Sequence, residues 1–179
     1  MNNGYEIRGD TTAIFIEGKG QHMETIISTN KLQSALSFPN KWHASWCPLR
    51  KAFYVTGHPP RNGGPSKTIC LHRWILRIDD PKIEVDHFDN NPLNNTDGNL
   101  RPCTREQNLQ NRTIQCNNSS GFRGVCFHKK TKKWQANLRI DGKQAYLGIY
   151  DSKEAAAEVV AEARKKHMPF SKEASGVVK

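Results

Sequence analysis

The chain has 179 residues, of which 27 are Lys or Arg and 17 are Asp or Glu, so its formal net charge is +10 and its sequence pI is near 9.5. This length fits one ordinary domain or two small ones, and the charge favours a polyanionic partner. The 5 cysteines form no C-x-x-C pair, so neither a disulfide framework nor a structural zinc site is indicated.

No stretch of the chain approaches the roughly 18 apolar residues of a membrane span. The start, MNNGYEIRGD, also lacks the apolar region of a signal peptide. We therefore expect a soluble, cytoplasmic protein with no membrane partner. The charge is uneven, because residues 1–115 carry 14 basic and 11 acidic side chains (+3), whereas residues 116–179 carry 13 and 6 (+7). Binding and chemistry are thus expected in different parts of the chain.

The first 70 residues mix loops with short strand-like runs at Thr12–Ile16, Glu24–Ser28 and Ala52–Thr56. The segment 58–67, HPPRNGGPSK, has the composition of a loop and is expected to be the most mobile part of this half. Residues 68–78, TICLHRWILRI, predict a strand that passes into a short helix.

This strand and helix contain three residues that invite a functional interpretation. The apolar neighbours of His72 favour a scaffold role for it over contact with phosphate. Arg73 and Arg77 are the better candidates for phosphate contact, because arginine presents several N–H donors and a fixed charge.

The segment 84–112, EVDHFDNNPLNNTDGNLRPCTREQNLQNR, holds the clustered residue types that hydrolysis needs. Its loop at 88–98 is rich in Asn, Asp and Gly, which predicts a hairpin between two short strands. Thr104, with Gln107 three residues later, has the spacing of a capping box. A helix is therefore expected to begin here, with Asn108 in its second turn.

Asp86 and His87 end the first of these strands, Asn99 follows twelve residues after His87, and Asn108 follows nine residues after Asn99. This spacing resembles the HNH endonuclease family, in the branch whose third residue is Asn. The resemblance implies a ββα-metal motif with His87 as general base and Asp86 and Asn108 as ligands of one divalent cation. It also implies that Asn99 holds the loop and so positions His87.

The chemistry independently needs these residue types. A histidine, with an ordinary pKa of about 6.5, accepts a proton from water at neutral pH. A hard cation such as Mg²⁺ takes oxygen ligands, often one or two carboxylates with waters and phosphate oxygens. One Asp and one Asn fit Mg²⁺ or Mn²⁺ and predict weak metal binding without DNA. The alternative is an Asn- and Asp-rich turn with a surface histidine.

Residues 114–120, IQCNNSS, are polar and aperiodic, which predicts a linker. Beyond them, a strand at Phe122–His128 is followed by a lysine-rich turn at 129–133 and an alternating strand at Trp134–Ile140. Asp141-Gly142 predicts a two-residue hairpin turn into a third strand, Lys143–Ile149.

The third strand is expected to point Ala145, Leu147 and Ile149 towards the core. A helix is predicted at Ser152–Lys166, capped by Asp151 with Glu154. Its apolar stripe, which is expected to pack on the sheet, consists of Ala155, Val159 and Ala163.

This second part resembles the plant ethylene-response-factor (APETALA-two type) DNA-binding domain. The matching runs are Gly121–Val125, Trp134–Ala136, Tyr146–Gly148 and the Ala-rich helix. The resemblance implies double-stranded DNA as partner, with the exposed sheet face in the major groove. The residues expected to contact DNA are Arg123, His128, Lys130, Lys132, Lys133, Asn137, Arg139, Gln144 and Tyr146.

Within that set, arginine suits guanine and Asn or Gln suits adenine, whereas the lysine-rich turn suits phosphate. Cys126 and Tyr146 replace residues of the plant pattern, so the plant recognition site does not carry over. The alternative for a basic three-stranded face is a solvated surface. A net charge of +6 over residues 121–150 (7 basic and 1 acidic) favours DNA contact instead.

These features together predict an α+β chain with a strand-rich HNH nuclease domain at 1–113, whose motif is 84–112. A linker at 114–120, a DNA-binding domain at 121–168 and a flexible tail at 169–179 would follow. The pattern resembles phage homing-type HNH endonucleases, which would act in the host cytoplasm. The expected function is metal-dependent hydrolysis of a DNA phosphodiester. Two alternatives remain, namely a non-catalytic, sequence-specific DNA-binding regulator with an HNH-like scaffold and a nuclease that acts on RNA.

Overall fold

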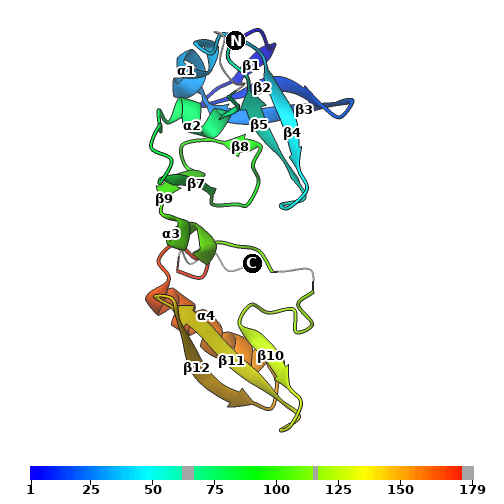
Figure 1. Cartoon of the computed structure of the whole chain (residues 1–179), viewed down its shortest axis with the longest axis vertical. Helices are drawn as coiled ribbons and strands as arrows, with labels where there is room; N and C mark the ends of the chain where they lie inside the picture. Colours follow the sequence, from blue (N-terminus) through cyan, green and yellow to red (C-terminus); the bar gives the residue numbers. More distant parts are fainter. Residues whose placement is uncertain (62–66, 115–116, 175–179) are drawn as a thin grey trace. The chain divides into compact units, whose positions relative to one another are not determined.

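The computed structural model describes residues 1–61, 67–114 and 117–174 (Figure 1). It is a strand-rich α+β structure with several small sheets and short helices. The chain divides into two compact units, Met1–Arg105 and Glu106–Lys179. This division falls earlier in the chain than the predicted boundary at 113–114. Among the described helices, none is long and apolar enough to cross a membrane.

The first unit is built on a four-stranded sheet with the order β1-β2-β3-β8. β2 and β3 cover the two strands predicted at 12–16 and 24–28 and extend beyond them. β8 pairs in parallel with β3, with Ile26 opposite Asn94, although the two are far apart in sequence. The strands are β1 Tyr5–Arg8, β2 Thr11–Gly18, β3 Gln21–Ser28 and β8 Asn94–Asn95.

A second sheet of this unit has the order β4-β5-β6, and α2 follows its last strand. Trp42 on β4 stacks on Phe38 with ring centroids 4.0 Å apart, and both side chains are fully buried. The elements are the 3₁₀ helix η1 Thr29–Lys31, α1 Leu32–Leu36, β4 Trp42–Cys47, β5 Ala52–Gly57, β6 Ile69–Cys70 and α2 Leu71–Ile75. Of the segment predicted to be mobile, 58–67, residues 62–66 lie outside the described residues.

The predicted hairpin of the central segment is formed by β7 (Glu84–His87) and β9 (Leu100–Cys103), which pair antiparallel. α3 (Arg105–Gln110) follows directly along the chain, as the signal at Thr104 predicts. The loop between the two strands contains β8, so it is pinned to the four-stranded sheet through β3.

The second unit contains the sheet β10-β11-β12 and the helix α4 (Figure 1). Its strands are β10 Val125–His128, β11 Lys133–Ile140 and β12 Lys143–Tyr150, and α4 spans Lys153–His167. Val125, Ala136, Ala156 and Val160 form its core, with Trp134, Leu147 and Tyr150 packed around them.

One orientation predicted for β12 is wrong. The pairing register shifts between Ala136 and Asn137, which lie opposite Gly148 and Tyr146. A bulge adds one residue to one strand, so the alternation of faces changes beyond it. Ile149 therefore pairs with Gln135 and shares its outer face, instead of pointing towards the core.

The predicted stripe of α4 is also wrong by one position. Ser152, and not Asp151, caps the helix, since its Oγ accepts a hydrogen bond of 3.1 Å from the backbone N–H of Ala155. The buried side chains of the helix are Ala156, Val160 and Arg164, one residue beyond those predicted.

The predicted linker and tail are partly structured. Ser120 is buried, and its hydroxyl donates to the Val125 carbonyl at 2.8 Å. In the predicted tail, Ser171 is buried and Glu173 pairs with Arg164 at 2.8 Å. Both segments therefore belong to the second unit where they are described, while 115–116 and 175–179 lie outside the described residues.

Candidate functional site

Asp86 and His87 are neighbours at the end of β7, and both are only 6% exposed. The carboxylate of Asp86 accepts a hydrogen bond of 2.5 Å from Arg101, which lies directly opposite it on β9. The guanidinium of Arg101 also stacks 4.7 Å from the ring centroid of Phe88. A buried carboxylate needs such a charged partner, because burial alone disfavours its ionised form.

The imidazole of His87 is held by residues from three other segments. Its Nε2 lies 3.2 Å from Oδ1 of Asn95, and its ring lies edge-on to those of His72 and Tyr54, with centroids 5.1 and 6.3 Å away. Nδ2 of Asn95 donates to Thr25 and Pro92, which fixes its oxygen towards His87. Nε2 then carries the imidazole proton, and Nδ1 is the basic nitrogen.

Burial lowers the pKa of His87, although the hydrogen bond to Asn95 and the charges of Asp89 and Asp86 act in the opposite direction. Burial also lowers the pKa of His72 to about 3, with smaller contributions in the same direction from His87 and Arg73. Both rings are therefore neutral at neutral pH. His72, predicted as scaffold, is 8% exposed and packs on His87 itself.

Asn99 is 5% exposed and holds the hairpin loop through both ends of its amide. Its Oδ1 accepts from the backbone N–H of Asp89 at 2.9 Å, and its Nδ2 donates to the Asp89 carboxylate at 2.9 Å and the Asn94 carbonyl at 2.7 Å. Its own carbonyl accepts from the N–H of Phe88, next to His87. Asn99 thus ties together both sides of the loop that follows the histidine.

Asn108, the second predicted metal ligand, lies on α3. The division between the two units falls at the start of this helix, so Asp86 and His87 belong to the first unit and Asn108 to the second. In the first unit, Asp86 offers the hard oxygen that Mg²⁺ takes, and a cation there would share this carboxylate with Arg101. The described residues contain no group of three or more His, Cys, Asp or Glu able to hold a metal.

The side chain of Arg123, one of the predicted DNA contacts, is bound to the backbone. Its guanidinium donates to the carbonyls of Gln110, Arg112 and Leu109, at 2.9, 2.5 and 3.3 Å, around the end of α3. Burial, with the nearby charge of Arg164, lowers the pKa of Arg123 to about 10. The last carbonyls of a helix have no partner within the helix, and an arginine placed there can donate hydrogen bonds to them. Its positive charge also interacts favourably with the negative end of the helix dipole.

Arg164 completes this anchor, because its Nη2 donates to the Gln110 carbonyl at 2.7 Å. Arg73, one of the two predicted phosphate contacts, also binds backbone, since it donates to the carbonyls of Ile83 and Asp80 at 2.5 and 2.7 Å. Arg77 is exposed, as a phosphate contact requires.

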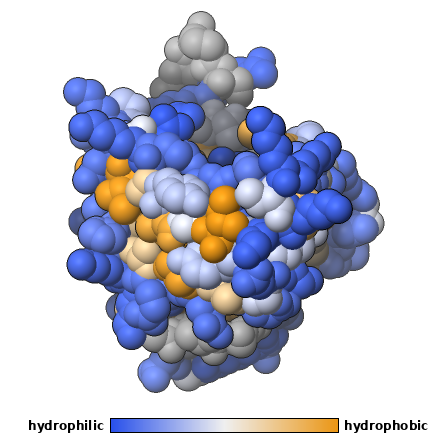
Figure 2. All heavy atoms as spheres, turned by 90° about the horizontal axis from the view of Figure 1, so that it is seen from below, coloured by the Kyte–Doolittle hydropathy of each residue, from blue (hydrophilic) through white to orange (hydrophobic). Residues whose placement is uncertain are grey.

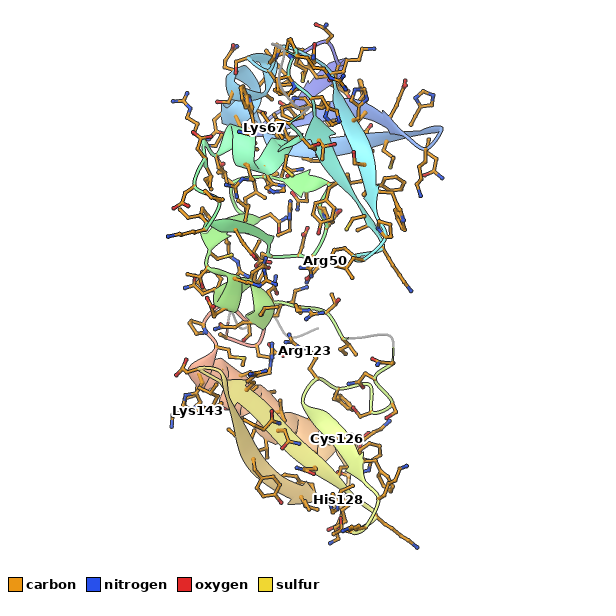
Figure 3. All side chains as sticks on the ribbon, in the orientation of Figure 1. Arg50, Lys67, Arg123, Cys126, His128 and Lys143 are labelled. Atoms are coloured by element: carbon orange, nitrogen blue, oxygen red, sulfur yellow. The ribbon has the colours of Figure 1, made fainter. Side chains whose placement is uncertain are left out.

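The outer face of the β10-β11-β12 sheet brings most of the predicted DNA contacts together. Cys126 and His128 lie on β10 (Figure 3), and the pairing places Cys126, Gln135 and Ile149 in one row, with Asn137 and Tyr146 in the next. Arg139 pairs with Gln144 at the hairpin end, where its Nε donates to the Gly142 carbonyl at 3.0 Å. Gln135 was not among the predicted DNA contacts, and Ile149 was predicted to point towards the core.

The lysine-rich turn lies at the opposite end of β11. Its Lys129, Lys130 and Lys132 are exposed, whereas Lys133 pairs with Asp151 at 2.8 Å. Nδ1 of His128 lies 2.8 Å from the hydroxyl of Thr131, so His128 orders this turn. On the face of the molecule that Figure 2 shows, a group of apolar residues lies at the surface, and hydrophilic residues surround this group.

Among known proteins, Protein 3.8 of Escherichia phage T7 is 31% identical to the chain over 88 residues, which are 49% of the chain and 73% of the phage protein. The chain belongs to the family of this phage protein. The name of the phage protein states no activity, so membership of this family brings no function with it.

Plant proteins match a shorter stretch. APETALA2-like protein 2 of Oryza sativa subsp. japonica is 46% identical over 39 residues, or 22% of the chain and 9% of the plant protein. The AP2-like ethylene-responsive transcription factor TOE2 of Arabidopsis thaliana is 46% identical over 39 residues, again 22% of the chain and 8% of the plant protein. The chain thus spans less than a tenth of either plant relative. No protein-family model and no solved structure matches.

Proposed function

We propose that the chain is a metal-dependent DNA endonuclease of the HNH type, guided to its substrate by the β10-β11-β12 sheet. The observation that carries this proposal is the surroundings of His87: a buried, neutral imidazole whose Nε2 is turned to Asn95, next to the Asp86 carboxylate. A general base needs this state, because the ring must be neutral to accept a proton and its orientation must be fixed. The antiparallel β7–β9 pair followed by α3 supports the same motif.

In the proposed reaction, Nδ1 of His87 takes a proton from a water molecule whose oxygen attacks the phosphorus atom. The bond from phosphorus to the 3′ oxygen breaks, leaving a 5′-phosphate and a 3′-hydroxyl by analogy with HNH enzymes. Asp86 and Asn108 are the proposed ligands of the cation, which supplies neutralisation of the phosphate charge when bound. Asn95 and Asn99 act as positioning residues through the bonds that fix His87 and its loop.

Sheet-guided binding is supported by the plant matches and by the exposed basic turn. Lysines at such a turn act as point charges on phosphate, so binding should weaken steeply as salt rises. Neutralising Lys130 and Lys132 together should weaken binding to all duplexes alike. The slope of log affinity against log salt should become shallower by about two units.

Plasmid cleavage with Mg²⁺, Mn²⁺ or EDTA tests the catalytic part of the proposal. The full chain should cut in either metal and not in EDTA, and His87→Ala should abolish cutting while duplex affinity stays within about twofold. His43→Ala is the matched control, since His43 is exposed on β4. Duplex binding without cleavage in any metal would replace this proposal with that of a DNA-binding regulator. Cleavage confined to RNA would reassign the substrate.

A further inference from the structure

The centre of the outer sheet face has a particular chemistry. The row across the three strands is Cys126, Gln135 and Ile149, and Asn137 follows Gln135 along β11 on the same face. The row therefore has an amide at its middle, flanked by a thiol on one side and an aliphatic side chain on the other. Tyr146, 60% exposed, borders this centre on β12.

The two amides are ordered by one another. Nε2 of Gln135 donates to Oδ1 of Asn137 at 3.1 Å, and Nδ2 of Asn137 points to the sulfur of Cys126 at 3.7 Å. An amide has two N–H donors and one carbonyl acceptor. Gln135 therefore presents one remaining N–H and its oxygen side by side.

The remaining N–H and the carbonyl oxygen of Gln135 are complementary to the major-groove edge of adenine. In the major groove adenine shows one acceptor, N7, and one donor, the N6 amino group, whereas guanine shows two acceptors. Guanine would require two donors from Gln135, and one of these is already committed to Asn137. The orientation that the row imposes thus favours adenine over guanine before DNA binds.

Ile149, the aliphatic side chain of the row, is complementary to thymine, the base that pairs with adenine. Thymine carries a C5 methyl group in the major groove, where cytosine presents a C–H and an N4 donor. Ile149 has no polar atom to meet that donor. An A·T pair therefore satisfies both halves of the row, whereas a G·C pair leaves polar edges without partners and offers Ile149 no methyl group.

The arginines of this unit do not counter the preference. Arg123 is bound to the carbonyls around the end of α3. Arg139 lies at the hairpin end, two residues beyond Asn137 along β11, with its Nε committed to Gly142. Among residues 117–174, the row itself therefore contains no arginine to pair with guanine.

We propose that Gln135 and Ile149 are specificity-determining residues, and that the sheet face reads A·T base pairs through adenine's Hoogsteen edge and the thymine methyl. This inference rests on the proposed DNA contact of the same face, and not on the proposed cleavage. It assigns a substrate class, duplex DNA with an A·T-rich central site, that the plant matches do not supply.

The test is binding of the full chain, in EDTA, to two duplexes of equal length whose central tracts are mixed A·T and mixed G·C. The A·T duplex should bind about tenfold more tightly, the size of one bidentate contact. Replacing central thymines by uracil, which removes only the methyl, should weaken binding about fourfold for each methyl group that Ile149 covers. Replacing adenines by 7-deazaadenine, which removes the N7 acceptor and keeps the N6 donor, should weaken binding through loss of one of the two hydrogen bonds to Gln135.

Variants assign these effects to residues. Ile149→Ala should weaken binding of the thymine duplex and leave binding of the uracil duplex unchanged. Gln135→Ala should weaken binding of the adenine duplex more than binding of the 7-deazaadenine duplex, which has already lost one of the two hydrogen bonds. Gln33→Ala, at an exposed position of α1, is the control. If a variant fails to fold, the base substitutions still test both contacts in the unaltered protein.

The outcomes separate the two proposals. Equal binding of both duplexes, a preference for G·C, or no effect of uracil would overturn the A·T assignment while leaving DNA binding in place. Absence of binding to any duplex would overturn the assignment together with the proposed DNA contact of the sheet.

Discussion

Asp86 and Arg101 face each other across the β7–β9 pair, with the carboxylate accepting a hydrogen bond of 2.5 Å from Nη2 of the arginine. The carboxylate is almost fully buried, whereas the arginine side chain keeps 24% of its surface exposed. Asp86 therefore already has Arg101 as a cationic partner. A divalent cation proposed to bind Asp86 would share the carboxylate with Arg101 or displace it.

Arg101→Gln should make the stability of the protein dependent on metal. Without metal, loss of the arginine that pairs with the buried Asp86 should lower the free energy of unfolding by about 3 kcal/mol. Added Mg²⁺ should recover part of this loss, so the rise in Tm with Mg²⁺ should be larger in the variant than in the parent chain. Arg8→Gln is the control, because Arg8 pairs with Glu6 and Glu24 at the surface. Equal Mg²⁺ shifts in parent and variant would remove Asp86 from the proposed metal site.

Asn99→Ala should reduce both activity and stability. The substitution leaves the Asp89 N–H and the Asn94 carbonyl without the amide that binds them, which costs about 1–3 kcal/mol. Loosening this loop should also lower kcat, since His87 precedes it. Asn30→Ala removes an exposed bond to Asp97 and should change neither quantity measurably. A fully active Asn99→Ala protein would contradict the positioning role.

The stability of the first unit should fall in acid because of His72. Its pKa lies near 3 in the folded chain and near its ordinary 6.5 in the unfolded chain, so the unfolded state binds the proton first. The stabilisation is complete above pH 6.5 and decreases as pH falls towards 3, by up to about 1.4 kcal/mol per pH unit. His72→Gln should flatten this part of the curve in urea denaturation, whereas His43→Gln should leave it unchanged. A parent curve that is flat between pH 6 and 4 would argue against a buried, neutral His72.

Local signals in the sequence predicted the elements well where the structure is local. The turn at Asp141-Gly142, the helix after Thr104 and the alternation along β11 all follow from neighbouring residues. The α+β class follows from the same signals. The parallel pairing of β8 with β3 was not predictable, because no short-range pattern encodes it.

The candidate site shows the same difference between features that neighbouring residues encode and features that depend on distant segments. Asp86, His87 and Asn99 were proposed as site residues from their spacing within one segment, whereas Asn95 and Tyr54 contact His87 through the folding of distant segments. Ile149 was misassigned because strict alternation cannot reveal a bulge. The backbone contacts of Arg123 were not predicted, because a motif match identifies a residue and not the carbonyls around which the chain later folds.

Substitutions of Arg123 and Arg139 should have different effects, because the first should lower stability and the second should lower DNA affinity. Arg123→Ala removes three hydrogen bonds to carbonyls around the end of α3 and should lower the unfolding free energy by about 2 kcal/mol, with base discrimination retained. Arg123→Lys should not restore it, because a lysine cannot reproduce the planar fork. Arg139→Ala, at an exposed position, should leave stability within about 0.5 kcal/mol and reduce DNA affinity.

The contacts of Arg123 and Arg164 with the end of α3 determine what removal of the second part of the chain should do. Removing residues 116–179 takes away Arg123 and Arg164, which hold the end of the helix that carries Asn108. Such a fragment should therefore lose cleavage even on DNA supplied at saturating concentration, and not only its affinity. Circular dichroism of the fragment should show less helix than removal of α4 alone accounts for. A fragment that cuts at the full rate once DNA is saturating would show that α3 needs no support from residues 116–179.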